Sequence, residues 1–400
     1  ESQELPEILN SICRDMQQQK GAYLALKTEN DYVKIYFHEI YYMESERNRL
    51  HIHTGKKEYI YNREQKEVFV PDIMKMYRGL RKKRLDSAYE KFLLDSREKD
   101  LYIWLKNHNV SVKEYKEWKN YSYDSTNIVF DKNARDVSLF VKDPYGNPYI
   151  PGSSLKGALR TIFCVNEILY DERIKKQTQN YIEKQLRNSR PGRGYLQKEI
   201  NNIESNIFHN LNIKDIPQYN AVQDNMKGVI ISDSRPLKVT DLTLCQKIDV
   251  DTRGRRTRRP ILRECIKPET KIEFDLTIND SINTNDYCDE YILEAVNNFL
   301  DGYYAFLNKY ETVEREKDII YLGGSVGFAS KTILYGLFPE REAVRVISTI
   351  FDKTLSKQIK LQHHHERDLR LGVSPHMKKC TEYAGKEYEF GKCKIAIEEI

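Results

Sequence analysis

The chain has 400 residues, a length that predicts two or more domains, each with its own buried core. Its 65 Lys and Arg against 60 Asp and Glu give a formal net charge of +5, which excludes a surface that is basic throughout, so a nucleic-acid surface must be a local patch. Seven dispersed cysteines form no Cys-x-x-Cys pair, and neither a signal peptide nor a membrane-length apolar run is present, so the sequence predicts a soluble cytoplasmic protein without a zinc knuckle, a redox motif or a membrane partner.

The first segment alternates like a set of short strands over residues 22–53. From about Tyr23 to Thr54 it resembles the first half of a LytTR-type DNA-binding domain, on the residues His38–Ser45 and Leu50–Thr54. Half of such a sheet would leave an unpaired edge and too little core for independent DNA binding. We therefore interpret residues 1–48 as a leader of uncertain status; the alternative is a divergent first strand of the fold that follows.

The next segment changes from strands to helices and back. Residues 58–70 predict two strands, 72–120 predict helices, and 127–141 predict strands again. The four consecutive cations Arg81–Arg84 favour a solvated helix face over a binding patch.

A turn-rich stretch ending in Pro-Gly leads into a helix predicted from Ser153 to about Tyr170. Ser153 and Ser154 are of the type that caps helix N-termini, and Lys156 and Arg160 lie on one side of the helix. Because a helix N-terminus, hydroxyls and cations attract anions, this stretch predicts a phosphate site. The alternative is a capped helix with solvated cations.

A basic region follows. Residues 171–220 predict two helices around a loop, and Val229–Ser232 predicts a strand. Two further predicted strands, 242–250 and 261–266, flank a tip whose seven residues include five arginines, Arg253, Arg255, Arg256, Arg258 and Arg259. Such density repels itself unless a polyanion neutralises it, so the tip predicts RNA contact, with a solvated loop as the alternative.

The last part of the chain alternates between further strands and helices. The predicted elements are a strand at 271–279, a helix at 286–311, a strand at 319–321, a helix at 340–351 and a last strand at 393–397.

A glycine-rich loop follows the predicted strand at 319–321 and contains Gly323, Gly324, Gly327 and Lys331. Glycines let a backbone approach a phosphate and the lysine adds charge, which predicts an RNA-backbone contact. Ser330 before the lysine, and Ser325 at the first required glycine, make the loop unlike a P-loop.

These motifs in combination resemble the RAMP superfamily of CRISPR ribonucleoproteins, and most of all the subunit of the type III-A (Csm) effector complex that caps the crRNA 3′ end. The matching segments, in order, are His51–Tyr61, Ile150–Arg160, Asp233-Ser234, Gln246-Lys247, Arg263–Pro268, Gly323–Thr332, Ser374–His376 and Gly391–Cys393.

The resemblance implies an α+β fold with two ferredoxin-like (RAMP/RRM-like) domains and helical insertions. The implied domains are 49–220 and 221–400, the second with the glycine-rich loop. It also implies a non-catalytic crRNA-binding subunit without a cofactor, which sets the limit of crRNA maturation in antiviral defence. The implied partners are crRNA, target RNA, the other Csm subunits and a host trimming nuclease.

Two rival functions and one metal hypothesis follow from other patterns. Ser153-x-x-Lys156 resembles the serine–lysine pair of penicillin-binding proteins, although the companion motifs at Ser232–Ser234 and Lys331–Ile333 are imperfect. The leader predicts a DNA-binding regulator instead. Three consecutive histidines, His363–His365, point about 100° apart on a helix, so we expect a solvated triplet and no metal.

Overall fold

The computed structural model describes residues 23–27, 32–36, 40–46, 49–54, 60–62, 67–95, 100–129, 137–188, 196–310 and 314–398. The chain divides into two compact units. Unit 1 comprises Glu1–Phe140, Leu242–Leu244 and Pro260–Cys265; unit 2 comprises Val141–Asp241, Cys245–Arg259 and Ile266–Ile400. Both units mix helices and sheets, so the α+β class is confirmed. The domain bounds 49–220 and 221–400 and the pair of ferredoxin-like domains stay predictions.

Unit 1 begins with two separate antiparallel hairpins, β1–β2 and β3–β4, which confirm the strands expected in residues 22–53. Its elements are β1 (Tyr23–Lys27), β2 (Tyr32–Tyr36), β3 (Ile40–Glu46), β4 (Arg49–Thr54), β5 (Ile60–Asn62), β6 (Glu67–Pro71), α2 (Ile73–Lys82), α3 (Asp86–Leu94), α4 (Leu101–Asn107), α5 (Val112–Glu117), β7 (Lys119–Asp124) and β8 (Val137–Ser138).

The helices of unit 1 share a core with the antiparallel sheet β5-β6-β7. Their core is aromatic: Trp104 lies against Tyr89 and Phe92 at ring-centroid distances of 5.6 and 5.4 Å. Phe69 of β6 reaches the same cluster through Tyr115 of α5. Capping carboxylates and hydroxyls divide the segment into short helices, with Asp72, Asp100 and Ser111 as side-chain N-caps.

Unit 2 carries most of the predicted binding motifs. Its elements are α6 (Gly152–Tyr170), α7 (Glu172–Asn188), α8 (Gln197–Phe208), β9 (Val229–Ile231), part of β10 (Leu242–Asp251) and of β11 (Arg256–Ile266), β12 (Leu276–Ile278), α9 (Asp289–Leu307), β13 (Ile319–Tyr321), α10 (Leu334–Leu337), α11 (Glu340–Thr354), α12 (Lys357–His363), α13 (Asp368–Leu371), β14 (Met377–Tyr383), β15 (Lys386–Glu389) and β16 (Lys392–Lys394).

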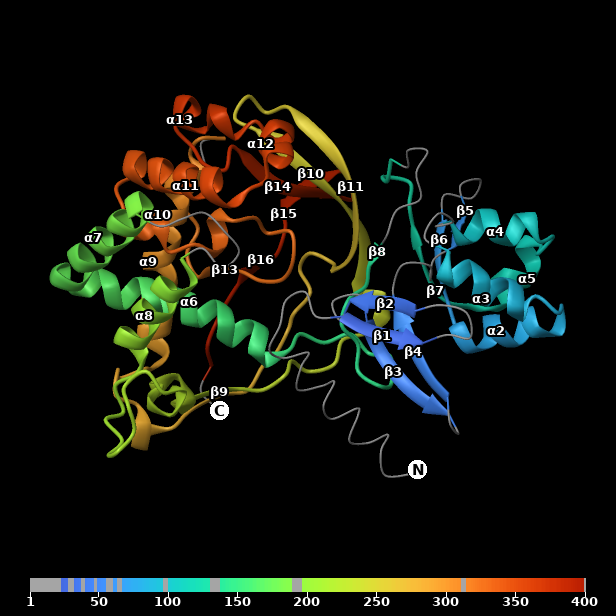
Figure 1. Ribbon diagram of the computed structural model, residues 1–400, viewed down its shortest axis with the longest axis horizontal. Helices are drawn as coiled ribbons and strands as arrows, with labels where there is room; N and C mark the ends of the chain where they lie inside the picture. The colour runs from blue at the N-terminus through green and yellow to red at the C-terminus, as the bar shows by residue number, and fades with distance from the viewer. Residues whose placement is uncertain are drawn as a thin grey trace. The chain divides into compact units, whose positions relative to one another are not determined.

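Helices α6 and α9 pack against each other in unit 2, and α10 packs on both (Figure 1). Phe163 of α6 stacks on Tyr287 at 5.0 Å and meets Tyr291 of α9 edge-on at 5.2 Å. Inside this contact, the amide of Asn298 donates to the buried Asn166 side chain over 2.8 Å. An apolar helix pair joined by one partly buried amide hydrogen bond therefore fixes the helix that carries the Ser153–Arg160 motif.

Short antiparallel strand pairs surround these helices. β9 pairs with β12, β13 pairs with β16, and β14 lies between β10 and β15. The expected strand at 271–279 is shorter than predicted, because residues 273 and 275 accept backbone bonds from the Ser232–Arg235 stretch outside a regular ladder. Among the described residues, no helix combines the length and apolar character that a bilayer span needs.

Candidate nucleic-acid interface

The helix that carries the Ser153–Arg160 motif begins one residue earlier than predicted. α6 starts at Gly152 with Pro151 as its N-cap, and neither Ser153 nor Ser154 makes a capping bond. Both serines lie in the first turn and are exposed. The prediction that these hydroxyls cap the helix is therefore wrong, and their side chains stay available at the surface.

A distant carboxylate takes the capping position instead. The Gly152 N–H donates to Asp233 Oδ1 over 2.8 Å, and the Ile150 N–H donates to Ser234 Oγ over 2.9 Å. A Cβ on Gly152 would lie 2.3 Å from the Ser232 carbonyl oxygen, so only glycine allows this close approach. The positive end of α6 is thus partly neutralised from within the chain, which weakens the predicted phosphate site.

Asp233 lies in Ser232–Ser234, the second motif of the acyl-enzyme hypothesis, and its bond to Gly152 brings this motif next to Ser153 of the first. Its carboxylate acts as a helix cap here, and the acyl-enzyme hypothesis stays a prediction. Asp143, in the turn-rich stretch before α6, accepts the N–H groups of Tyr145 and Asn147. Burial alone would raise the pKa of Asp143, but these bonds lower it below its usual range, as expected for a turn-forming carboxylate.

The two cations of α6 have different environments. Arg160 donates to Glu204 over 3.0 Å and to Asp224 over 2.8 Å, and its guanidinium lies over the Phe208 ring at 4.3 Å. These internal contacts balance the charge of Arg160, and its role as a phosphate ligand stays a prediction. Lys156 makes no ion pair with any described residue; burial and neighbouring Arg160 lower its pKa, against an opposing effect of Asp224.

The arginine-rich tip is a hairpin, as expected, but the arginines are mostly paired. Four of the five meet a carboxylate of the same unit: the partners of Arg255, Arg256, Arg258 and Arg259 are Asp251, Glu387, Glu382 and Asp249, at 2.7, 3.0, 2.9 and 2.6 Å. The argument that only a polyanion could relieve their repulsion is therefore wrong, because acidic residues beside the hairpin relieve it. Only Arg253 of this group is exposed without an ion pair to a described residue.

The hairpin also extends further than predicted. β11 begins at Arg256, so three of the arginines lie in the strand and the turn itself spans Thr252–Arg255. Asp249, which is buried, contacts both Arg259 and Lys379. Burial alone would raise the pKa of Asp249, but these two cations hold it below its ordinary value.

The glycine-rich loop lies between β13 and α10 and has the backbone conformation that its sequence suggests. Gly323 and Gly327 have φ angles of 87° and 94°, which L side chains rarely adopt. The Lys331 ammonium group is exposed and donates to the Gly323 carbonyl over 2.7 Å. The lysine therefore closes the loop and places its charge beside an exposed, glycine-lined backbone.

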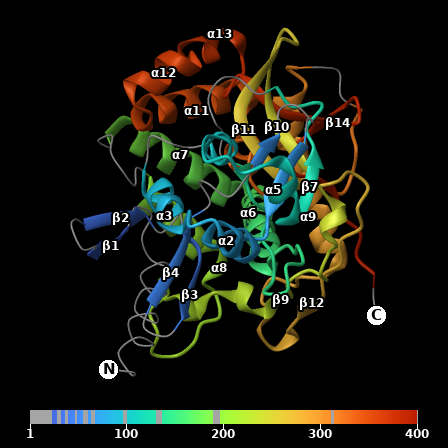
Figure 2. The same ribbon diagram turned by 90° about the vertical axis from the view of Figure 1, so that its right-hand side faces the viewer.

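The predicted phosphate motifs do not all form one site. Both views place the hairpin tip at the top of unit 2, well above α6 (Figures 1 and 2). The hairpin and α6 are thus separate candidate contacts along an extended ligand.

One buried group was missed from the sequence. His365 is buried rather than solvated, and its ring lies near the carboxylate of Asp368, which also accepts from His376 and Ser374. Burial alone would raise the pKa of Asp368, but these three donors lower it. The Ser-Pro-His segment that resembles the family was a signal for this cluster, but nothing in the sequence placed Asp368 beside it.

An α+β chain with an exposed lysine beside a glycine-lined loop and an exposed arginine on a hairpin turn defines a candidate nucleic-acid-binding protein. The chain belongs to the RAMP superfamily, whose family model matches residues 47–328. The match begins at the end of the predicted leader, and the LytTR resemblance stays a prediction.

The chain is similar to curated proteins described as "CRISPR system Cms protein Csm5". The protein from Streptococcus thermophilus is 28% identical over 382 residues, covering 88% of this chain and 95% of that protein. The protein from Mycobacterium tuberculosis (strain ATCC 25618 / H37Rv) is 27% identical over 271 residues, covering 66% of this chain and 67% of that protein.

Among solved structures, the chain is similar to one in the "Csm-crRNA-target RNA ternary complex in type III-A CRISPR-Cas system", determined by cryo-EM. The TM-score is 0.54 at 16% identity, covering 84% of this chain and 93% of that one. The likeness shows a shared fold.

Proposed function

We propose that this chain is a subunit of a type III-A CRISPR effector complex, which binds the crRNA, caps its 3′ end and so sets its maturation limit. The supporting observation is the similarity to a Csm5 protein over 88% of this chain and 95% of that relative. The subunit acts without catalysis in cytoplasmic antiviral defence. Its proposed partners are crRNA, target RNA, a neighbouring RAMP backbone subunit and a host nuclease that trims the 3′ end.

The glycine-rich loop is the proposed main contact with the crRNA backbone. Gly323 is exposed, and a Cβ there would meet nothing within 4 Å, so the positive-φ backbone is open to a phosphate. Lys331 stands over this backbone and supplies the charge. Such a contact is independent of base identity, as a subunit that binds many different guides requires.

The other contacts are proposed to be weaker than the loop. Ser153, Ser154 and Lys156 offer two exposed hydroxyls and a cation on the first turns of α6. Arg253 extends from the hairpin turn and reaches the guide or the guide–target duplex. Arg160 is left out because its charge is already balanced by two carboxylates.

The test is a salt series of RNA binding with the reconstituted complex. Lys331→Gln removes the charge while its amide can still donate to the Gly323 carbonyl, so it separates charge from loop closure. We expect weaker binding and a shallower dependence of log K on log salt, by about 0.7 for one single-strand phosphate contact. The matched control is Lys176→Ala, an exposed lysine on α7 that is expected to change neither quantity. An unchanged slope for Lys331→Gln would remove the loop from the proposed interface.

A further inference from the structure

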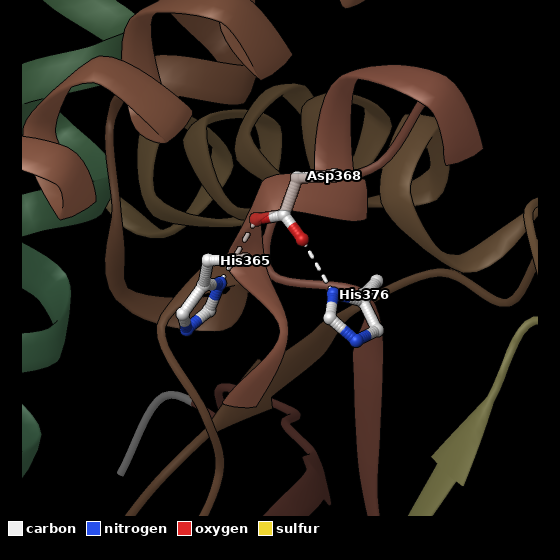
Figure 3. A group of neighbouring side chains, drawn as sticks. All are labelled: His365, Asp368 and His376. Atoms are coloured by element: carbon white, nitrogen blue, oxygen red, sulfur yellow. Dashed lines mark hydrogen bonds and ion pairs between the residues drawn. The ribbon is translucent and has the colours of Figure 1, made fainter. Parts of the chain in front are cut away.

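A carboxylate and two imidazoles meet in the last third of unit 2, apart from the proposed RNA contacts. Asp368 opens α13, His365 precedes it in a short 3-10 helix, and His376 directly precedes β14. The Asp368 side chain is completely buried, and those of His365 and His376 are 10% and 5% exposed. Figure 3 shows the carboxylate between the two rings, with one oxygen directed at each.

The contacts are made through one nitrogen of each ring. His365 Nδ1 lies 3.0 Å from Asp368 Oδ2, and His376 Nδ1 is in contact with Oδ1. One ligand atom from each of the three residues can be chosen so that all lie within 4.8 Å of one another. The two rings stand edge to face at a centroid distance of 5.9 Å.

The surroundings hold this group rigidly. The Ser374 hydroxyl donates to Asp368 Oδ2 over 2.6 Å, and so orients the carboxylate. The backbone of Ser374 is fixed by the buried Tyr335. The Tyr335 hydroxyl donates to the Ser374 carbonyl over 2.7 Å and accepts from the Ser374 N–H over 3.1 Å. An outer layer of this kind orients the ligands of metal sites in proteins.

We propose that His365, Asp368 and His376 are the protein ligands of one divalent transition-metal ion of the Zn²⁺ class. Two neutral imidazoles and a carboxylate form a donor set that zinc accepts, with Zn–N and Zn–O distances of about 2.0–2.2 Å. Two imidazoles bound to one ion have ring centroids roughly 5–6 Å apart at these bond lengths, which agrees with the observed spacing. Imidazole nitrogens do not suit Ca²⁺ or Mg²⁺, which prefer oxygen.

The ion would take the place of the Nδ1 protons that face the carboxylate. Each neutral imidazole would then carry its one ring proton on Nε2, so binding to the neutral rings changes the tautomer and releases no net proton. In the fold, such an ion would tie the segment around α13 to β14. A second cluster, Cys288–Glu290 at the N-terminus of α9, carries no such proposal, because the Cys288 thiol already caps that helix.

The experiment uses the full chain, stripped with a chelator and dialysed. Titration with Co²⁺, followed by its visible absorption bands, is expected to saturate at one ion per chain, and Zn²⁺ is expected to displace it. His365→Ala and His376→Ala should each weaken Co²⁺ binding more than tenfold, and Ser374→Ala about 10–100-fold as a positioning residue. His364→Asn is the matched control: asparagine tolerates the left-handed backbone of this position, and the His364 imidazole contacts exposed Glu366 rather than Asp368, so Co²⁺ binding should be unchanged.

X-ray absorption of the zinc-loaded wild-type protein tests the proposal even where a variant does not fold. We expect a first shell of nitrogen and oxygen with imidazole scattering. A sulfur shell at about 2.3 Å would place the ion on cysteine and overturn the proposal. Failure of wild-type protein to bind one equivalent of Co²⁺, or equal binding by folded His376→Ala, would overturn it as well, and the cluster would then be a hydrogen-bonded support for a buried carboxylate.

Discussion

Two glycines on one helix should respond in opposite directions to the same substitution. A Cβ on Gly152 would lie 2.3 Å from the Ser232 carbonyl oxygen and 2.4 Å from that of Ile231, whereas a Cβ on Gly157 would meet nothing within 4 Å. Gly157→Ala should stabilise α6 by about 0.8–1 kcal/mol, the propensity difference between the two residues in a helix interior. Gly152→Ala has to push the Ser232 backbone away.

The cost of Gly152→Ala has two parts. Forcing a methyl group into close-packed backbone costs about 1–3 kcal/mol, and weakening the capping bond to Asp233 costs about 1 kcal/mol more. We therefore expect a loss of about 2–4 kcal/mol. For a unit of this size, Tm should fall by roughly 4–16 °C, while Gly157→Ala should raise it by about 2–4 °C.

The assay is thermal unfolding by circular dichroism, with hydrogen exchange of α6 peptides to assign the transition that changes. The two variants carry the same substitution at two positions of one helix, so each controls for the other. If Gly152→Ala proves as stable as Gly157→Ala, the close approach of α6 to the Ser232 backbone is not what the glycine serves, and the explanation fails.

Three further predictions concern charges of unit 2. Arg160→Ala should lower the unfolding free energy in urea by about 1–3 kcal/mol, because two carboxylates lose their partner, and should leave RNA affinity unchanged. A loss of RNA affinity without a loss of stability would show that Arg160 binds RNA rather than supporting the fold. Arg253→Ala should weaken RNA binding without changing stability, whereas Arg259→Ala should destabilise the fold, and identical effects of the two would contradict their different pairing. Asp249→Asn should destabilise most at neutral pH. The pKa of Asp249 is lowered in the folded protein, so its contribution to stability is present above about pH 4 and is lost as the pH falls through the folded pKa. The difference in unfolding free energy between wild type and Asp249→Asn should therefore shrink in acid. A difference that stays constant with pH would refute the ion-pair account.

Periodicity and motif spacing predicted most elements of the fold. The helix 153–170 was found within one residue, the strand 319–321 was found as predicted, and the hairpin around the arginines was recognised from its flanking strands. These elements carry strong local signals, in the form of apolar periodicity and glycine or proline at their ends.

The electrostatic partners could not be predicted in the same way. The partners of Arg160 are Glu204 and Asp224, which lie more than forty residues away in the sequence. Asp233, which accepts from Gly152, is also distant from it in the sequence. A single sequence shows where charges are dense but not which distant carboxylates neutralise them. The internal partners of the arginine tip were missed for the same reason.

The prediction that all three histidines of His363–His365 are solvated was wrong for a related reason. Helical geometry separates consecutive side chains, and that argument was sound for His363 and His364, both of which are exposed. A left-handed residue at His364 ends α12, however, and turns His365 inward toward Asp368. Local geometry changed within the triplet, which residue types alone did not indicate.

The central claim is that this chain holds the 3′ segment of a crRNA. The most direct measurement is to express it with its operon neighbours, purify the assembly under nuclease treatment and sequence the RNA that remains bound. The account predicts repeat–spacer RNA with a defined 3′ limit, which becomes heterogeneous when Lys156 and Lys331 are both changed to Gln. An assembly without RNA, or with random fragments whose ends do not depend on these lysines, would contradict it.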